Sequence, residues 1–176
     1  MYIMKILSKC YGYFLCKIDH SLTKYYRFLG VNIGKNCSFV GRNISVSSEP
    51  YLITIGDNVR ISFDVCFVTH DGGTHVLRNK YPNSAIYGKI KVGNNVFIGV
   101  RSIIMPGVVI EDNCIIGAGS IVTKKCGSNG VYAGVPAKRI CSIEEYESKN
   151  KDFLLPICNY NYKNKKRILL NNKKVR

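Results

Sequence analysis

Three histidines, His20, His70 and His75, are the side chains of this 176-residue chain best suited to proton transfer near neutral pH. An imidazole has an ordinary pKa of about 6.5, so it can take a proton from a hydroxyl group and pass it to a leaving group. No nucleophile triad is evident, and eight scattered cysteines do not by themselves indicate a covalent intermediate. General base catalysis on a hydroxyl is therefore the chemistry that these residues favour.

His70 and His75 also lie close enough in sequence to be considered as metal ligands. A catalytic zinc ion needs three protein ligands and an open position. His20 is the only other histidine, and no two cysteines have the C-x-x-C spacing. The sequence therefore predicts no metal site. Since no cleavable signal peptide is visible and the cysteine spacing does not indicate a disulfide scaffold, we expect a reducing, cytoplasmic setting.

A repeat of six residues runs through the chain and defines the elements that position these side chains. Its aliphatic or aromatic positions are Ile55, Ile61, Phe67, Val92, Ile98, Ile104, Ile110, Ile116 and Val122. Neither the helical period nor simple alternation gives a repeat of six, whereas short strands separated by tight corners do. Three such sides make a coil of 18 residues, the spacing of Val92 and Ile110, and stacked coils bury a continuous aliphatic core.

Two interruptions of the repeat are visible. Residues 71–89 lack it and are rich in Gly, Asn and Pro, so we expect a loop insertion there. A shorter insertion of four residues, 47–50, separates the first two coils. His70 lies where the chain leaves a coil for the longer loop, and His75 lies within that loop. A long loop in a strict repeat is usually functional.

These residues resemble the hexapeptide-repeat acyltransferases, and most of all their sugar O-acetyltransferase branch, which includes galactoside and maltose acetyltransferases. The similarity covers residues 31–140 and rests on segments 55–59, 92–99, 117–124 and 133–138. It implies an all-β fold, a left-handed parallel β-helix, with a short N-terminal helical segment (1–30) and a C-terminal extension (141–176). It also implies a homotrimer with active sites between neighbouring chains.

The resemblance further implies an O-acetyltransferase that moves an acetyl group from acetyl-CoA to a hydroxyl of a sugar or polysaccharide precursor. In that family the base is a histidine where the coil gives way to the acceptor loop, which implies this role for His70. Asp64 and Asp71 are candidates to orient its ring, with a place at a coil corner as the favoured alternative for Asp64. Candidates for acceptor contacts in the loop are Asp71, His75, Arg78 and Tyr87. The positions that match the acetyl-CoA site are Phe97, Gly99, Ala118, Gly119, Thr123, Lys124, Pro136, Lys138 and Arg139.

Much of the net charge of +15 lies near the C-terminus, where residues 161–176 carry seven Lys or Arg and no acid. We expect a helix beginning near Ser142, followed by a loose basic tail that is either solvated or in contact with an anionic surface such as a membrane. The apolar residues and lysines of the N-terminal segment favour a helix packed on the coil, with peripheral membrane contact as the alternative. No aromatic–basic pattern accompanies the charge, so we expect no nucleic-acid partner.

Other proteins with this fold leave alternative functions open. Serine- and antibiotic-type acetyltransferases are alternatives, although about 30 N-terminal residues cannot supply the large helical domain usual in the former. The γ-type carbonic anhydrases need a third histidine in the coils. A non-catalytic scaffold or lipid-surface module is the remaining alternative, and the presence of His70 favours the enzyme.

Overall fold

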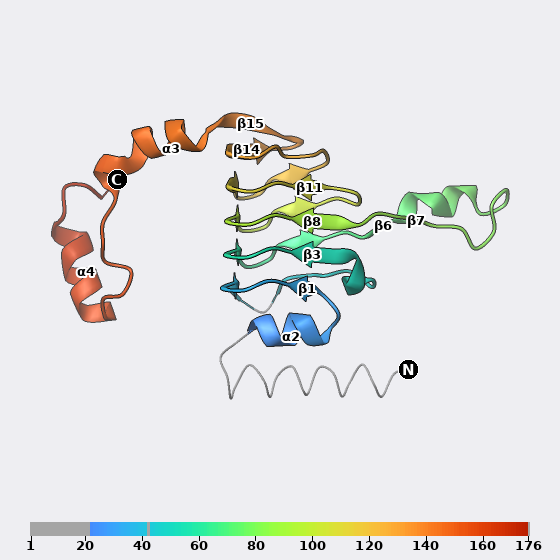
Figure 1. Cartoon of the computed structure of the whole chain (residues 1–176), viewed down its shortest axis with the longest axis horizontal. Coiled ribbons are helices and arrows are strands. Elements are labelled where there is room, and N and C mark those ends of the chain that lie inside the picture. The colour runs from blue at the N-terminus through green and yellow to red at the C-terminus, as the bar shows by residue number, and fades with distance from the viewer. Residues whose placement is uncertain (1–21, 42, 176) are drawn as a thin grey trace.

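The computed structural model of the protein describes residues 22–41 and 43–175 (Figure 1). His20 and most of the expected N-terminal helical segment lie outside these residues. The described part of that segment forms helix α2, Leu22–Phe28, which lies against the first coil (Figure 1). Tyr26 of α2 is buried, its ring stacks on Phe39 with centroids 4.7 Å apart, and its hydroxyl donates to the Ile44 carbonyl at 3.2 Å. Helix α2 therefore covers one end of the core.

The chain then winds through stacked coils that contribute strands to three parallel sheets (Figure 1). The first sheet contains, in spatial order, β1 (Asn32–Ile33), β3 (Ile53–Ile55), β8 (Ile90–Val92) and β11 (Val109–Ile110). The second sheet contains β2 (Ser38–Phe39), β4 (Arg60–Ile61), β9 (Phe97–Ile98), β12 (Cys114–Ile116) and β14 (Gly130–Gly134). The third sheet contains β5 (Cys66–Phe67), β10 (Ile103–Ile104) and β13 (Ile121–Val122). Each of these strands pairs in parallel with the equivalent strand of the neighbouring coil, as Ile104 of β10 pairs with Val122 of β13.

Corners between the sheets have the backbone that the sequence predicts. Five asparagines in successive coils adopt positive φ between 53° and 56°: Asn36, Asn58, Asn95, Asn113 and Asn129. Asparagine tolerates this left-handed conformation better than most residues. The side chains also stack, because the Asn95 amide donates to Asn113 at 2.8 Å and the Asn113 amide donates to Asn129 at 3.0 Å. The corner therefore connects neighbouring coils as well as turning the chain.

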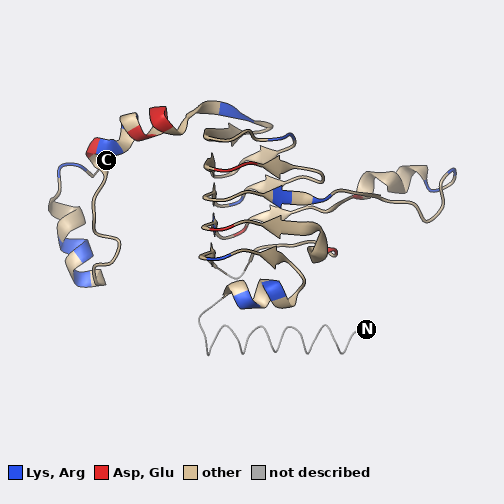
Figure 2. Cartoon of the chain, viewed as in Figure 1, with Lys and Arg blue, Asp and Glu red and all other residues tan. Residues whose placement is uncertain are grey.

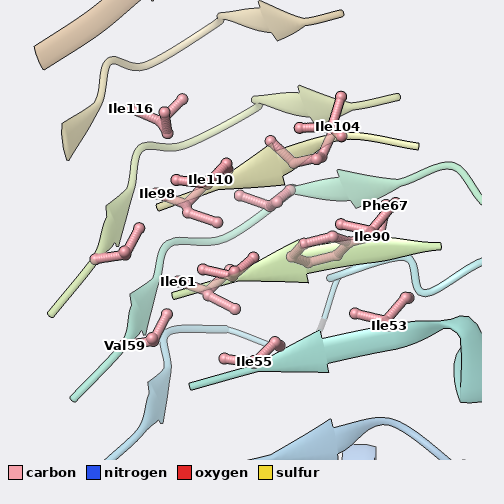
Figure 3. Packing of buried hydrophobic residues seen from close by; sticks show 14 of the residues in the cluster. Ile53, Ile55, Val59, Ile61, Phe67, Ile90, Ile98, Ile104, Ile110 and Ile116 are labelled. Carbon is pink, nitrogen blue, oxygen red and sulfur yellow. The ribbon is translucent and has the colours of Figure 1, made fainter. Parts of the chain in front are cut away.

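The core consists of the repeat positions, as predicted. From Ile55 to Val122 every one of the nine is at most 2% exposed, and Figure 3 shows several of them, among them Ile61, Ile98 and Ile116, stacked between the sheets. Residues four positions later are also buried, except where the inserted loop begins at Asp71, and the Gly117 carbonyl accepts hydrogen bonds from the hydroxyls of Ser102 and Ser120 at 3.0 and 2.6 Å. The six-residue spacing thus fixes which side chains point inward.

The inserted loop (residues 71–89) is more ordered than its composition predicts. It leaves the coils through β6 (His70–Asp71), forms the 3-10 helix η2 (Gly72–Leu77), and returns through β7 (Ile86–Tyr87), which pairs antiparallel with β6. The shorter insertion contains the 3-10 helix η1, Pro50–Leu52. His70 therefore belongs to the two-stranded base of the inserted loop.

The C-terminal region differs in part from expectation. Strand β15 (Ala137–Ser142) folds back antiparallel on β14. Helix α3 (Ile143–Asn150) begins at the expected cap, with the Ser142 hydroxyl accepting from the Glu145 amide at 3.1 Å, and η3 (Lys151–Phe153) follows. We expected a loose tail beyond it, but residues Tyr162–Asn171 form helix α4, because Asn161 caps its first turn and good helix formers follow. Among the described residues, no helix has both the length and the apolar character needed to cross a bilayer.

Candidate active site

His70 lies at one edge of the coils, where the chain passes from the third sheet towards the first; we call this the His70 edge. The two ends of the inserted loop are joined at this edge by a backbone hydrogen bond, in which the Gly88 amide donates to the Thr69 carbonyl at 2.9 Å. A side chain at Gly88 would collide with the backbone of Pro106 and Gly107 in the next coil, so only glycine fits there. The base of the loop, and with it the position of His70, is therefore fixed by backbone packing.

Glu49 contacts the His70 ring. Its Oε2 atom lies 2.9 Å from His70 Nδ1, and the same oxygen accepts a hydrogen bond of 2.7 Å from the Thr69 hydroxyl. Thr69 is completely buried, while the side chains of Glu49 and His70 are 15% and 37% exposed. The hydrogen bond from Thr69, and after it the one from His70, lowers the pKa of Glu49 below its ordinary value. Glu49 is therefore a carboxylate at neutral pH.

This contact assigns the proton on a neutral His70 ring. A carboxylate can only accept hydrogen bonds, so Nδ1 must carry the hydrogen that lies between the two groups. In the neutral ring Nε2 is then left with its lone pair. The pair thus has the arrangement of a general base held in one tautomer by a carboxylate, in a side chain that solvent and ligands can reach.

The two aspartates proposed to orient the ring have other partners. Asp71 caps η2, accepting from the Gly73 amide at 2.7 Å. Asp64 is a corner residue with φ of 58°, and its carboxylate lies 3.6 Å from Arg101 Nε. Glu49, and neither aspartate, therefore contacts the ring: Asp71 is engaged in its own turn, whereas Asp64 occupies the alternative place at a coil corner and faces Arg101.

Of the predicted acceptor contacts, Asp71 follows His70 in β6, and Tyr87 lies beside His70 on the neighbouring strand. His70 and Tyr87 are paired between β6 and β7, and their ring centroids are 6.0 Å apart. His75 and Arg78 lie further out in the inserted loop and hydrogen-bond to each other. Both are exposed, so they are free to meet a ligand or another chain at the tip of the loop. Within residues 22–41 and 43–175 no group of three potential metal ligands occurs.

Thr123 and Lys124 share the His70 edge. They follow β13, as His70 follows β5, and these strands are separated in the third sheet only by β10. Two strand spacings place the groups roughly 10 Å apart along the coil axis. Both residues are exposed. A ligand that extends along this edge can therefore contact both ends of it.

Ala118, Gly119 and Gly99 lie at the neighbouring edge, between the second and third sheets. Gly119 has φ of 69° and open space where a Cβ would stand, and both it and Ala118 are exposed. Gly99 is instead buried against the backbone of Ala118, so it permits close packing of coils rather than offering a surface. The exposed backbone at Ala118 and Gly119 has room for a narrow ligand.

Phe97 is not brought together with His70 in one chain. It lies in β9 of the second sheet, which faces away from the His70 edge of the three-sided coil. There it lines a groove of about 570 Å³ with Ile115, Tyr146 and Leu154. Pro136, Lys138 and Arg139 lie in or beside the exposed β14–β15 hairpin, where Arg139 donates to the Asn129 carbonyl at 3.1 Å. The predicted donor positions are thus divided among separate surfaces of one chain.

Sequence reasoning missed Glu49 and Thr69 as parts of the site. The available signal was the four-residue insertion at 47–50, which places an acid at the same edge as His70, one coil earlier. Because equivalent edges of successive coils lie one strand spacing apart, an acid in that insertion is within reach of the histidine. An insertion next to a candidate base therefore deserves the same scrutiny as the longer loop.

Comparisons with known proteins agree with this architecture. The family model described as "Hexapeptide repeat of succinyl-transferase" matches residues 89–124. The chain is 49% identical to protein CapG of Staphylococcus aureus over 149 residues, 82% of this chain and 85% of that protein. It is 44% identical to the galactoside O-acetyltransferase of Escherichia coli over 117 residues, 65% of this chain but only 55% of that protein.

Solved structures give the same relationship. A maltose O-acetyltransferase from Clostridium difficile 630 superposes with a TM-score of 0.61 at 30% identity, covering 78% of this chain and 83% of that one. A galactoside acetyltransferase in complex with coenzyme A superposes with a TM-score of 0.56 at 30% identity, covering 72% of both chains. With the stacked coils of six-residue repeats and the histidine at the base of the inserted loop, these similarities show that the chain belongs to the hexapeptide-repeat acyltransferases, in their sugar O-acetyltransferase branch.

Proposed function

We propose that the protein transfers an acetyl group from acetyl-CoA to a hydroxyl of a sugar or polysaccharide precursor, with His70 as the general base. The observation that carries this proposal is the hydrogen bond between Glu49 and His70 Nδ1, because it leaves Nε2 as the basic atom. Relatives named galactoside and maltose O-acetyltransferases support the sugar hydroxyl as acceptor. By the same resemblance, we take the coil to be left-handed.

In the reaction assigned to His70, the acetyl group passes directly from the thioester to the acceptor hydroxyl, and no covalent enzyme intermediate forms. The acceptor hydroxyl gives its proton to Nε2 while its oxygen forms a bond to the acetyl carbonyl carbon. The thioester C–S bond then breaks, and Nε2 returns the proton to the departing sulfur. Glu49 stabilises the imidazolium that exists between these two transfers, and it keeps the ring oriented throughout.

The donor end of the site fits a long, phosphate-bearing co-substrate. Acetyl-CoA supplies the activated acyl group as a thioester. Ala118 and Gly119 leave room against the backbone for a narrow chain, and the exposed Lys124 and Lys138 offer positive charge for phosphates. Coenzyme A is present in the galactoside acetyltransferase structure, and acetyl coenzyme A is present in a related Vibrio cholerae structure.

A homotrimer with sites between neighbouring chains is part of this proposal. His70 and Phe97 lie on opposite sides of the coil, so a second copy is needed to bring such surfaces together. The inserted loop has the form expected of an element that reaches a neighbour, because its apolar side chains are exposed; Val76 is 82% and Ile86 59% exposed. A cyclic assembly would give each chain one such contact on either side.

The first test replaces the base. His70→Ala is expected to lower kcat by about a hundredfold or more in an assay of CoA release with a panel of glycans, corrected for acetyl-CoA hydrolysis. The side chain is partly exposed and outside the core, so the unfolding midpoint should change little, by no more than the loss of one hydrogen bond to Glu49. Lys80→Ala, at an exposed position of the same loop with no assigned role in binding, is the matched control for damage to the loop. Unchanged kcat in the His70 variant would refute the assignment.

The second test asks whether two chains form each site. His70→Ala removes the base, and Ala118→Trp blocks the donor surface at an exposed position. Each variant alone should be inactive, whereas co-assembled mixtures should recover about a quarter of wild-type activity, since one interface in four pairs an intact base with an intact donor surface. Mixtures that remain inactive, with mixed trimers demonstrated by mass, would place the whole site in one chain.

A further inference from the structure

Charge is separated along the C-terminal arm (residues 143–175). Figure 2 shows acidic residues on α3 and basic residues on α4. The arm contains no acidic residue after Asp152. The cations described in this acid-free part are Lys163, Lys165, Lys166, Arg167, Lys173 and Lys174. All six are exposed. Helix α4 also lies away from the coils, at the far end of the arm (Figure 1), so this charge is not shared with the proposed active site.

One side of α4 combines these cations with exposed apolar side chains. Tyr162, Lys166 and Leu170 are spaced by four residues, so they form a stripe along the helix. Lys163 and Arg167 form the adjacent row, again four residues apart. Tyr162 is 81% exposed and Leu170 is 75% exposed, whereas Ile168, on the opposite side of the helix, is half-buried, as is Leu169, which borders the stripe beside Tyr162. The most exposed side of the helix is therefore both basic and apolar.

The cations of α4 are not used within the described part of the chain. The ion pairs found there join Glu49 with His70, Asp64 with Arg101, and Glu111 with Lys125. Like charges held on adjacent turns repel one another, which costs helix stability unless an external anion is present. The charge on α4 is therefore available to a partner outside the described part of the chain.

We propose that this side of α4 binds an anionic lipid bilayer surface. Lysine and arginine side chains reach lipid phosphates while their alkyl stems lie along the interface. Tyrosine and leucine on the same stripe can enter the headgroup region, where tyrosine is favoured by its apolar ring and polar hydroxyl. A soluble polyanion would use the charges but would leave Tyr162 and Leu170 in water, so the apolar residues favour the bilayer. The helix lies on the membrane and does not cross it.

The experiment measures binding of the full chain to vesicles of phosphatidylcholine with about 30% phosphatidylglycerol, and to vesicles of phosphatidylcholine alone. Wild-type protein should bind only the anionic vesicles, and binding should fall about tenfold or more when salt is raised from about 50 to about 500 mM. Replacing Lys163, Lys165, Lys166 and Arg167 together by Gln should weaken binding about a hundredfold. The matched control removes four exposed positive charges elsewhere: Lys35, Lys91, Lys149 and Lys151, each to Gln. This control should bind within about twofold of wild type.

Two outcomes would overturn the proposal. Vesicle binding that survives the α4 variant would place any membrane contact elsewhere in the chain. The second arm compares vesicles with dextran sulfate: the double variant Tyr162→Ser, Leu170→Ser should lose about tenfold in vesicle binding and nothing in dextran sulfate binding. Equal effects on both ligands would show a general polyanion site instead of a lipid surface. Acetyl transfer to a soluble acceptor should be unchanged in all these variants, so failure here leaves the proposed function untouched.

Discussion

Ile104, in the middle of the coils, is completely buried, whereas Leu154, in the C-terminal arm, is 68% exposed. The same contrast holds along both regions. Neither α3 nor α4 contains a buried residue, and Ile157 is the one side chain of the described arm that is buried. The coils are thus held by contacts between residues distant in sequence, while the helices of the arm are stabilised mainly by their own caps at Ser142 and Asn161.

This difference in burial indicates that the coils provide the stability of the fold, while the inserted loop and the arm present side chains for recognition. Because a parallel coil buries its repeat positions cooperatively, a change at one of them is transmitted to coils above and below. The inserted loop and the arm have no buried apolar positions of this kind apart from Ile157, so their side chains can be selected for contact with ligands or other chains. Substitutions in the appendages should therefore change the stability of the protein less than substitutions at the buried repeat positions of the coils.

Cysteine reactivity gives the largest expected contrast between the two regions. Burial in the coils raises the pKa of Cys126 from 9.0 to about 12, whereas Cys158 lies exposed in the arm. Only the thiolate reacts with alkylating agents, so a rise of this size reduces the reactive fraction about a thousandfold. In native protein near pH 8, Cys158 should be labelled at least that much faster than Cys126, as followed by mass spectrometry of peptides.

Denaturant supplies the control for this comparison. In unfolded protein both thiols should react at similar rates, because the burial that raises the pKa of Cys126 is lost. Comparable labelling of the two residues in the native protein would mean that the last coil opens readily. The closed core described here would then not extend to Cys126.

Much of the coil structure could be predicted from the sequence because its information is local and repeated. The buried positions from Ile55 to Val122 and the asparagine corners follow from spacing alone. Arg101 is an exception: it has positive φ of 58° at a corner where sequence gives no such signal. There the coil geometry outweighs the cost of a left-handed conformation in a residue with a Cβ.

The site was only partly predictable. The position of His70 next to the break in the repeat marks it as the candidate base, whereas its contact with Glu49 could not be predicted, since that contact depends on stacking between two coils. Helix α4 was missed for a different reason: its charge suggested solvation, while the cap at Asn161 and its helix-forming residues decide the local structure. The repeat therefore predicts the buried positions and corners of the coils, whereas contacts between its two insertions, such as that of Glu49 with His70, become visible only in the three-dimensional structure.

Core substitution gives the next largest contrast. Ile104→Ala should lower the free energy of unfolding by about 2–5 kcal/mol, because it removes a fully buried side chain and leaves a cavity between coils. Leu154→Ala removes a similar but exposed side chain from the arm and should change the free energy of unfolding by less than about 0.5 kcal/mol. Urea unfolding of both variants measures the difference. Equal losses would show that the arm is packed as tightly as the coils.

The smallest expected effect tests the contact between two coils at the site. Glu49→Gln keeps a hydrogen-bond acceptor for His70 Nδ1 but removes the negative charge, so kcat should fall about tenfold while KM for the acyl donor stays unchanged. Thr69→Val removes the other hydrogen bond to Glu49 and should have a weaker effect on kcat, with the carboxylate still present. A rise in KM without loss of kcat would assign Glu49 to binding instead of positioning.

The same variant has a signature in the pH dependence of stability. The pKa of Glu49 is lowered in the folded protein from its ordinary value of 4.5, chiefly by the Thr69 hydrogen bond. A depressed pKa means that the contribution of Glu49 is fully present above that ordinary value and is lost as pH falls through the folded-state pKa. The unfolding midpoints of wild type and Glu49→Gln should therefore differ at pH 7 and converge as the pH is lowered below 4.5. A difference that is independent of pH would instead trace the effect of the substitution to packing, and the charge on Glu49 would have no part in holding the two coils together.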